Sequence, residues 1–193
     1  MTTTRTAFAL VAALLLGGCG YQAIPRADNA VTAAWAEVEN QYQRRADLVP
    51  NLVETVKGYA AHEKETLEAV VEARARATSI QLKADDLTPE RLKQFEAAQA
   101  QLKGALGRLL AVAENYPQLK ASENFRDLQA QLEGTENRIA IARRRYIEAV
   151  QGFNDLVTVP PTSWTNSMFY KKQPKPQFQA TTPDAATAPK VKF

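Results

Sequence analysis

The side chains best suited to metal binding or acid–base chemistry lie close together between residues 62 and 65. His62 is the only histidine of the chain, and Glu63 and Glu65 follow it. A di-iron centre in a helical bundle needs a Glu-x-x-His pair on each of two helices, so one histidine cannot supply it. We therefore expect His62 to lie on the surface or beside a helix, and we predict no metal, no cofactor and no catalytic residue. An envelope enzyme or metal-dependent factor that uses His62 and nearby glutamates remains the alternative.

Other signatures of catalysis and nucleotide binding do not occur. The sequence contains no Gly-x-Ser-x-Gly motif and no glycine-rich loop that would hold a phosphate. The single cysteine, Cys19, excludes a disulfide framework and a cysteine-based metal site. These observations favour a protein that binds or supports other molecules over an enzyme.

The isoelectric point near 9.0 and three arginines at 143–145 suggest nucleic-acid binding. Consecutive helical residues point about 100° apart, however, so the three arginines do not form one stripe. Residues 28–170 carry 17 basic and 20 acidic side chains, whereas residues 171–193 carry five lysines and one aspartate. The basic character therefore belongs to the C-terminal tail, and we predict no nucleic-acid partner.

The N-terminal residues have the composition of an export signal. Arg5 is the only charged residue among the first 25, and an apolar run extends from Ala7 to Leu16. This run is shorter than the roughly 20 residues that span a bilayer and is typical of a secretory signal peptide. The letters LGGC at 16–19 resemble a bacterial lipobox, in which the cysteine is acylated and becomes the new N-terminus. An ordinary signal peptide followed by a free cysteine is the alternative.

We expect residues 1–18 to be a lipoprotein signal peptide and residues 19–27 to be a lipidated tether that begins at Cys19. Two or more acyl chains hold a protein stably at a membrane, so we predict the membrane as one partner. In Gram-negative cells, an aspartate after the acylated cysteine commonly retains a lipoprotein at the inner membrane, but Gly20 stands here. The resemblance therefore implies a protein that faces the periplasm, with the outer membrane favoured over the inner membrane.

Residues 28–158 predict an all-α domain, because apolar residues recur there every three or four positions and no long stretch alternates apolar and polar residues. We expect an up-and-down four-helix bundle, with the aromatic rings of Trp35, Tyr42 and Tyr59 in its core. The four apolar stripes are Val31, Trp35, Val38 and Tyr42; Leu52, Val56, Ala60, Leu67 and Val70; Leu92, Phe95, Leu102, Leu106 and Leu109; and Phe125, Leu128, Leu132, Ile139, Tyr146, Val150 and Phe153.

Pro50 leaves the first helix boundary open. The stripe that begins at Val31 continues in phase through Arg45, Val49 and Leu52, which favours one long kinked helix. Such a helix would reach about 80 Å at 1.5 Å per residue, far longer than its partners. We therefore favour a break near residues 47–50, with Asp47 capping the second helix. At the next boundary, Thr88 and Pro89 predict a capped helix start.

Six of the ten prolines lie after residue 158, so residues 159–193 predict an irregular C-terminal extension that ends in a flexible tail. Within this extension Trp164, Phe169 and Tyr170 lie outside the regular stripes, and they are the best candidates for contact with a partner protein. Inside the bundle, a separate hypothesis is that Asp47, Glu136 and Arg143 form a polar layer that fixes the register of the helices.

Several segments resemble the LemA family of bacterial envelope proteins, in order and at similar spacing. They are RRADLVPNLV at 44–53, VKGY at 56–59, HE at 62–63, ARA at 73–75, YPQLKA at 116–121, NF at 124–125, GTENRIA at 134–140, ARRRY at 142–146 and PKVKF at 189–193. The resemblance implies a helical bundle that is exposed outside the cytoplasm and attached to a membrane. Family members commonly carry an N-terminal transmembrane helix, and they commonly have an asparagine where Ile147 stands here.

The family implies no agreed reaction, so the resemblance indicates an architecture more than an activity. We expect a membrane-anchored envelope lipoprotein that acts as a non-catalytic binding or scaffolding module for unidentified envelope proteins. A purely structural spacer is a further alternative, and the sequence does not indicate the oligomeric state.

Overall fold

The computed structural model describes the backbone of residues 2–178 and the side chains of residues 21–178. The described chain consists of helices joined by loops and contains no strand, which confirms the predicted all-α class. Its long helices are α1 (Thr2–Lys57), α2 (Lys64–Ser79), α3 (Pro89–Ala113) and α5 (Glu123–Thr158). The short elements are η1 (Ala84–Asp86), α4 (Pro117–Ala121), α6 (Thr162–Thr165) and η2 (Asn166–Tyr170).

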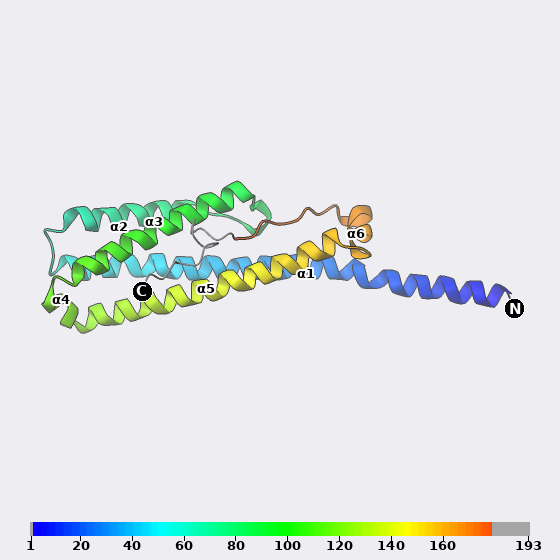
Figure 1. Ribbon diagram of the computed structural model, residues 1–193, viewed down its shortest axis with the longest axis horizontal. Coiled ribbons are helices and arrows are strands. Elements are labelled where there is room, and N and C mark those ends of the chain that lie inside the picture. The colour runs from blue at the N-terminus through cyan, green and yellow to red at the C-terminus, as the bar shows by residue number, and fades with distance from the viewer. Residues whose placement is uncertain (1, 179–193) are drawn as a thin grey trace, which may run out of the picture.

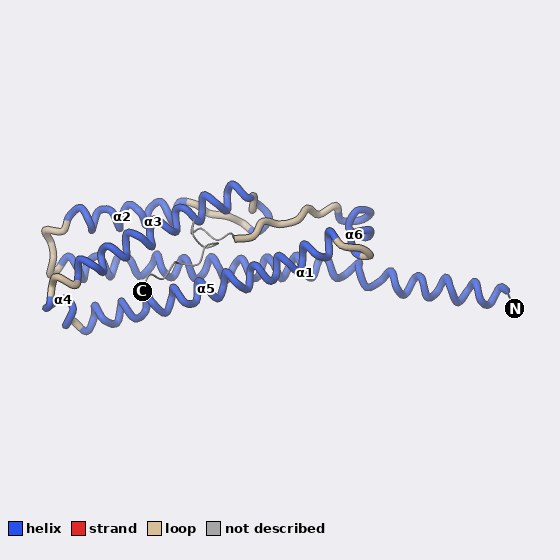
Figure 2. The backbone as a smooth tube through the Cα atoms, viewed as in Figure 1, coloured by secondary structure: helices blue, strands red, loops and turns tan. Residues whose placement is uncertain are grey.

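The long helices lie side by side and alternate in direction along the chain (Figure 1). Helix α1 packs along α5, and α2 packs along α3. The α1–α2 loop and α4 lie at one end, which we call the distal end, while α6 lies at the opposite end, where α1 leaves the bundle. Figure 2 shows the loop after η2 running back along the bundle toward Phe178.

Helix α1 does not end at Pro50, so the predicted break near residues 47–50 is wrong. The chain leaves the helix after Lys57 instead, and Asp47 lies on the exposed side of α1 rather than at a helix start. Proline has no backbone N–H, so it leaves the carbonyl four residues earlier without its usual helical partner. That carbonyl belongs to the buried Ala46, and it accepts a hydrogen bond from Arg74 Nε of α2 at 2.8 Å.

A side chain also replaces the missing backbone donor at Pro25, the other proline within the described part of α1. The carbonyl four residues earlier belongs to Tyr21, and it accepts a hydrogen bond from the Tyr170 hydroxyl at 2.6 Å. At both prolines, a side chain from a distant part of the chain therefore replaces the missing backbone donor. Helix α1 continues through two prolines because the tertiary structure satisfies the carbonyls that they free.

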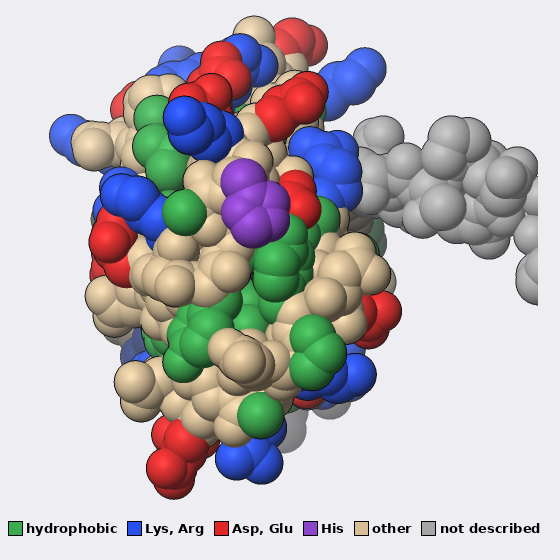
Figure 3. Space-filling model, turned by 90° about the vertical axis from the view of Figure 1, so that its left-hand side faces the viewer, with side chains coloured by type: hydrophobic (Ala, Val, Ile, Leu, Met, Phe, Trp, Pro, Cys, Tyr) green, Lys and Arg blue, Asp and Glu red, His purple; other side chains and the backbone are tan. Residues whose placement is uncertain are grey.

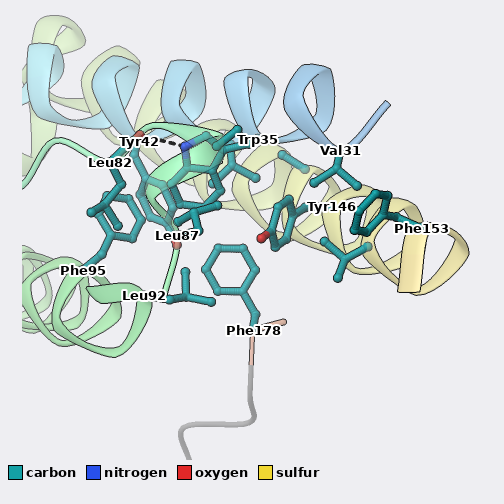
Figure 4. Packing of buried hydrophobic residues seen from close by; sticks show 14 of the residues in the cluster. Val31, Trp35, Tyr42, Leu82, Leu87, Leu92, Phe95, Tyr146, Phe153 and Phe178 are labelled. Carbon is teal, nitrogen blue, oxygen red and sulfur yellow. Dashed lines mark hydrogen bonds between the residues drawn. The ribbon is translucent and has the colours of Figure 1, made fainter. Parts of the chain in front are cut away.

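The core consists of two apolar clusters, one after the other along the bundle. In the cluster nearer α6, the Trp35 ring lies 5.3 Å from that of Tyr146 and 6.1 Å from that of Phe178. The Trp35 indole N–H donates to the Leu82 carbonyl at 2.9 Å (Figure 4). The distal cluster joins α1, α2 and α3 with α4 and the start of α5.

The predicted apolar stripes account for most of this core. Every residue of the four stripes is buried except Leu128, which is half-buried. The expectation for Tyr59 is wrong, because this residue follows the end of α1 and is 45% exposed. At the start of α3, the predicted cap is confirmed, since the Arg91 backbone N–H donates to Thr88 Oγ1 at 3.2 Å.

The C-terminal extension is less irregular than the prolines suggest. Between Pro161 and Pro174 the chain forms α6 and the single π-helical turn η2, because this interval has no proline to block helical hydrogen bonds. The predicted flexible tail, residues 181–190, lies outside the described residues, as does the side chain of Cys19. Within the described part of the chain, no helix combines the length and apolar character needed to cross a membrane.

The hydrogen bond at Pro50 generates a prediction for Arg74. Replacing Arg74 by Leu leaves the Ala46 carbonyl without a donor, so we expect the free energy of unfolding to fall by about 1–3 kcal/mol. In a Pro50→Ala background, the restored N–H of residue 50 donates to this carbonyl. Arg74→Leu should then lower the free energy of unfolding by a smaller amount. Urea unfolding of the four proteins of this double-mutant cycle measures the coupling.

The control is Arg76→Leu on the same helix, which removes only an exposed ion pair with Glu72. Exposed ion pairs contribute about 0–1 kcal/mol, so we expect little change. If Arg74→Leu lowers the free energy of unfolding equally with and without Pro50, then Arg74 does not replace the donor that Pro50 lacks.

Candidate functional site

A network of polar groups, buried except for the partly exposed Glu136, connects all four long helices between the two apolar clusters. The Arg45 side chain of α1 is only 2% exposed, and its Nη1 donates to Glu136 Oε1 of α5 at 2.7 Å. Its Nη2 donates to Oε1 of Gln99 on α3 at 2.6 Å and to the Gln99 carbonyl at 3.0 Å. The Gln99 amide then donates to the Ala77 carbonyl of α2 at 3.2 Å. We call these four residues the four-helix network.

The four-helix network marks the boundary between the two clusters. On α1 the cluster near α6 ends at Tyr42 and the distal cluster begins at Val49, with Arg45 between them. The guanidinium also lies over the Tyr42 ring, 5.0 Å from its centre. An arginine stays charged at this depth, so each displacement of one helix along another would separate a buried charge from its partners.

A second polar pair lies toward α6, about one turn along α3 from Gln99 and two turns along α5 from Glu136. Arg143 Nη2 of α5 contacts Glu96 Oε1 of α3 at 2.6 Å, and its guanidinium lies 4.3 Å from the centre of the Phe178 ring. Burial raises the pKa of the Glu96 carboxyl, and the nearby Arg143 lowers it in part. Arg143 thereby connects α5, α3 and the C-terminal segment.

The predicted polar layer thus differs from the observed one in membership. Glu136 and Arg143 both lie in the polar region, but they pair with Arg45 and Glu96 rather than with each other. Asp47 is exposed, and its carboxylate accepts a hydrogen bond from Gln43 on the same helix face at 2.7 Å. The prediction for Asp47 is wrong because two residues of helix rotate a side chain about 200°, away from the direction of Arg45.

Sequence reasoning did not identify Arg45, Gln99 or Glu96 as members of this region. A signal for Arg45 existed, because it occupies a position of the apolar stripe in α1. An arginine in such a stripe must be paired if the stripe is buried. Gln99 carries the same signal, because it stands in the apolar stripe of α3, four residues after Phe95 and three before Leu102. Nothing comparable marks Glu96 among the many polar residues of α3.

Three of the grooves between neighbouring helices of the described chain have volumes above 400 Å³. The α3–α5 groove encloses about 420 Å³ and contains the ion pairs described above. The α2–α3 groove encloses about 510 Å³ and is lined mainly by alanines and charged side chains. The α1–α2 groove is larger, at about 650 Å³, and Val53, Leu67 and the 52% exposed Val71 line it. Charged residues of both signs border these apolar side chains: Glu54, Lys57, Lys64, Glu68 and Glu72.

The distal end carries the residues that suggested metal or acid–base chemistry. Tyr116 donates to Glu63 Oε1 at 2.9 Å, and its hydroxyl lies 2.8 Å from His62 Nε2. The hydrogen bond to Glu63 raises the pKa of the Tyr116 hydroxyl. Figure 3 looks at this end and shows the histidine exposed beside hydrophobic and acidic side chains. Among the described side chains, no three His, Cys, Asp or Glu residues lie close enough to share a metal ion.

The predicted partner-contact residues lie at the opposite end. Trp164 and Phe169 are 67% and 61% exposed, whereas Tyr170 is half-buried because its hydroxyl bonds to the Tyr21 carbonyl. The chain beyond them is held to α1 at Asp28, whose carboxylate contacts Lys172 Nζ at 2.8 Å and Lys175 Nζ at 2.7 Å. Burial raises the pKa of Asp28, but the two lysines together bring it below its ordinary value.

The four-helix network predicts the effect of removing Glu136. Replacing Glu136 by Leu leaves the Arg45 charge buried without its carboxylate, so we expect the free energy of unfolding to fall by about 3 kcal/mol. Adding Arg45→Met removes the buried charge, so we expect the double variant to regain most of the lost free energy of unfolding. Urea unfolding measures both variants against Glu133→Leu, an exposed glutamate one turn away. A change in Glu136→Leu no larger than that of Glu133→Leu would contradict the role of the network.

The ion pairs of Asp28 predict a dependence on pH. A carboxylate with a lowered folded pKa contributes stability above its ordinary pKa of 3.8, and the contribution disappears as the pH falls through the folded pKa. We expect Asp28→Asn to lose about 1 kcal/mol at neutral pH, with the gap to the unmodified chain closing in acid. Unfolding curves across this range measure the gap, and Asp155→Asn serves as the exposed control. A gap that stays constant or widens in acid would contradict this assignment.

Comparison with known proteins relates this arrangement to a family. Residues 34–193 match the LemA family, and this range includes the four-helix network, the three grooves and the C-terminal segment. "Protein LemA" of Metamycoplasma hominis is 26% identical over 146 residues, or 76% of this chain. The chain spans 62% of the length of that relative. The resemblance noted from the sequence is therefore confirmed: the chain belongs to the LemA family.

Proposed function

We propose that this chain is a membrane-anchored envelope lipoprotein of the LemA type and acts as a non-catalytic binding or scaffolding module. In this proposal the anchor is an acylated Cys19, the bundle faces the periplasm, and the outer membrane is favoured over the inner membrane. The lipobox-like letters LGGC at 16–19 support the anchor. The match to the LemA family extends over the bundle from residue 34 onward, which supports the LemA type of this proposal.

The observation that carries the binding role is the α1–α2 groove. It is larger than the other two grooves, and its apolar side chains include Val71, a valine that is half exposed to water. Val53 and Leu67 are buried beneath the groove, so Val71 is the apolar side chain that water reaches there. A bound apolar surface would recover the free energy that its exposure costs. A charged border with both signs supplies directional contacts around such a surface.

The partner that fits this groove is an amphipathic helix from another envelope protein. Such a helix would place apolar residues against Val53, Leu67 and Val71. Its polar flanks would meet border charges of both signs, among them Lys64 and Glu68. Since α1 is continuous between the N-terminal region and Lys57, a partner held here would keep a fixed place relative to the anchor.

Photo-crosslinking in cells tests this function. A benzophenone amino acid at the exposed position 68, on the border of the groove, should form a discrete crosslink to one protein. We expect Val71→Lys to abolish this crosslink, because a charge in the apolar part of the groove opposes docking. Ile141→Lys is the matched control, since Ile141 is 43% exposed on α5 and lies outside the groove.

Crosslinking that persists unchanged in Val71→Lys would contradict the groove as the binding surface. The absence of a discrete crosslink in every variant would favour a structural spacer over a binding module. Retention of the crosslink in Ile141→Lys, together with normal protein levels for both variants, distinguishes loss of docking from loss of folding.

A further inference from the structure

Four exposed apolar side chains gather at the end where α1 leaves the bundle, and we call them the foot patch: Tyr21, Trp164, Met168 and Phe169. Their exposed fractions are 54%, 67%, 72% and 61%. Tyr21 belongs to α1, and the others come from α6 and η2 near the other end of the sequence. The rings of Tyr21 and Phe169 meet edge to face, 5.8 Å between centres. Two distant segments therefore build one surface at this end (Figure 1).

The foot patch is held by specific hydrogen bonds although its side chains face solvent. The Tyr170 hydroxyl bonds to the Tyr21 carbonyl that Pro25 frees, which fixes η2 against α1. The buried Asn166 donates to the carbonyls of Val157 and Lys172 and accepts from the Lys172 N–H at 2.9 Å. The exposed rings are therefore presented on a fixed support.

The residue types of the foot patch suit the boundary between lipid and water. Tryptophan and tyrosine combine an apolar ring with one polar group, and they concentrate at the headgroup level of membranes. Phenylalanine and methionine add apolar surface that would enter the upper part of the acyl chains. Four such side chains exposed together to water are costly unless something apolar covers them.

The two segments that carry the foot patch have charges of one sign. Residues 19–27 and 159–171 contain no aspartate or glutamate, and their charged residues are Arg26 and Lys171. Basic side chains beside a membrane surface gain about 1 kcal/mol each from anionic lipids. A membrane is therefore a better match for this end than a basic or neutral protein surface.

The position of the foot patch in the chain also favours contact with a membrane. Cys19 precedes Tyr21 by two residues, which is about 3 Å along a helix. The chain after an acylated Cys19 would thus enter the structure directly at the foot patch. We propose that the foot patch lies in the headgroup region of the membrane that holds the anchor, an inference that rests on the membrane attachment proposed above. The bundle is then fixed at two points, the acyl chains and the foot patch, so it stands in one orientation with the α1–α2 groove away from the lipid.

Quenching of tryptophan fluorescence tests this contact. The lipidated full chain is reconstituted into vesicles of phosphatidylcholine and phosphatidylglycerol, with acyl chains either unmodified or brominated near the headgroup. The chain has two tryptophans, and Trp35 is buried in the core. The variant Trp164→Phe reports Trp35 alone, so the difference between the two proteins reports Trp164. We expect most of the Trp164 emission to be lost in brominated vesicles.

The matched control moves the exposed tryptophan to the distal end. Trp164→Phe with Tyr59→Trp places it at a position that is also exposed, and we expect its emission to be unchanged by the brominated lipid. Flotation with the vesicles measures the anchor separately. We expect the unmodified chain to float and the Cys19→Ala variant not to float.

A protein that floats with the vesicles but keeps its full Trp164 emission would contradict contact between the foot patch and the membrane. It would not contradict attachment through the acylated Cys19. This is the result expected if the patch instead binds a protein partner, as the sequence suggested. If the lipidated protein does not float with the vesicles, the proposed membrane anchor is wrong, and so is the proposed contact of the foot patch with the membrane.

Discussion

The rest of the structure depends on how α1 continues through Pro25 and Pro50. Each proline removes a backbone donor and leaves a carbonyl that must find another partner. Arg74 of α2 supplies the donor for Ala46, and Tyr170 of η2 supplies it for Tyr21. These two hydrogen bonds attach α2 and the C-terminal turns to defined places on α1, so the prolines that would weaken an isolated helix help to position its neighbours.

Between these two attachments lies the four-helix network. An apolar layer in the middle of the bundle would allow the helices to slide by a turn at little cost, since apolar contacts are not directional. The Arg45 guanidinium requires Glu136 and Gln99 at fixed distances, and Gln99 in turn requires the end of α2. A buried charge stabilises a fold less than good apolar packing, but it penalises every arrangement that separates it from its partners.

This construction separates the molecule into two ends with different character. The end near α6 presents aromatic and basic residues beside the start of the bundle, and the distal end presents His62, Tyr116 and the open end of the α1–α2 groove. The described part of the chain brings no cluster of potential metal ligands together.

Much of the fold follows from local patterns that the sequence displays directly. Apolar residues at three- and four-residue spacing identified the buried faces, and Thr88 with Pro89 identified the start of α3, because periodicity and capping act over a few residues. The path of the chain at Pro50 and the pairing of Arg45 with Glu136 did not follow. Each depends on a partner from a distant element: Arg74 lies 24 residues after Pro50, and Glu136 lies 91 residues after Arg45. The exposure of Asp47 is a consequence of the unbroken helix, which turns this side chain away from the direction of Arg45. The sequence by itself determined which faces are buried, because burial follows from the chain's own periodicity. Only the tertiary structure decided where α1 ends and which charges meet, because a freed carbonyl or a buried guanidinium is stable only beside a group that folding brings to it.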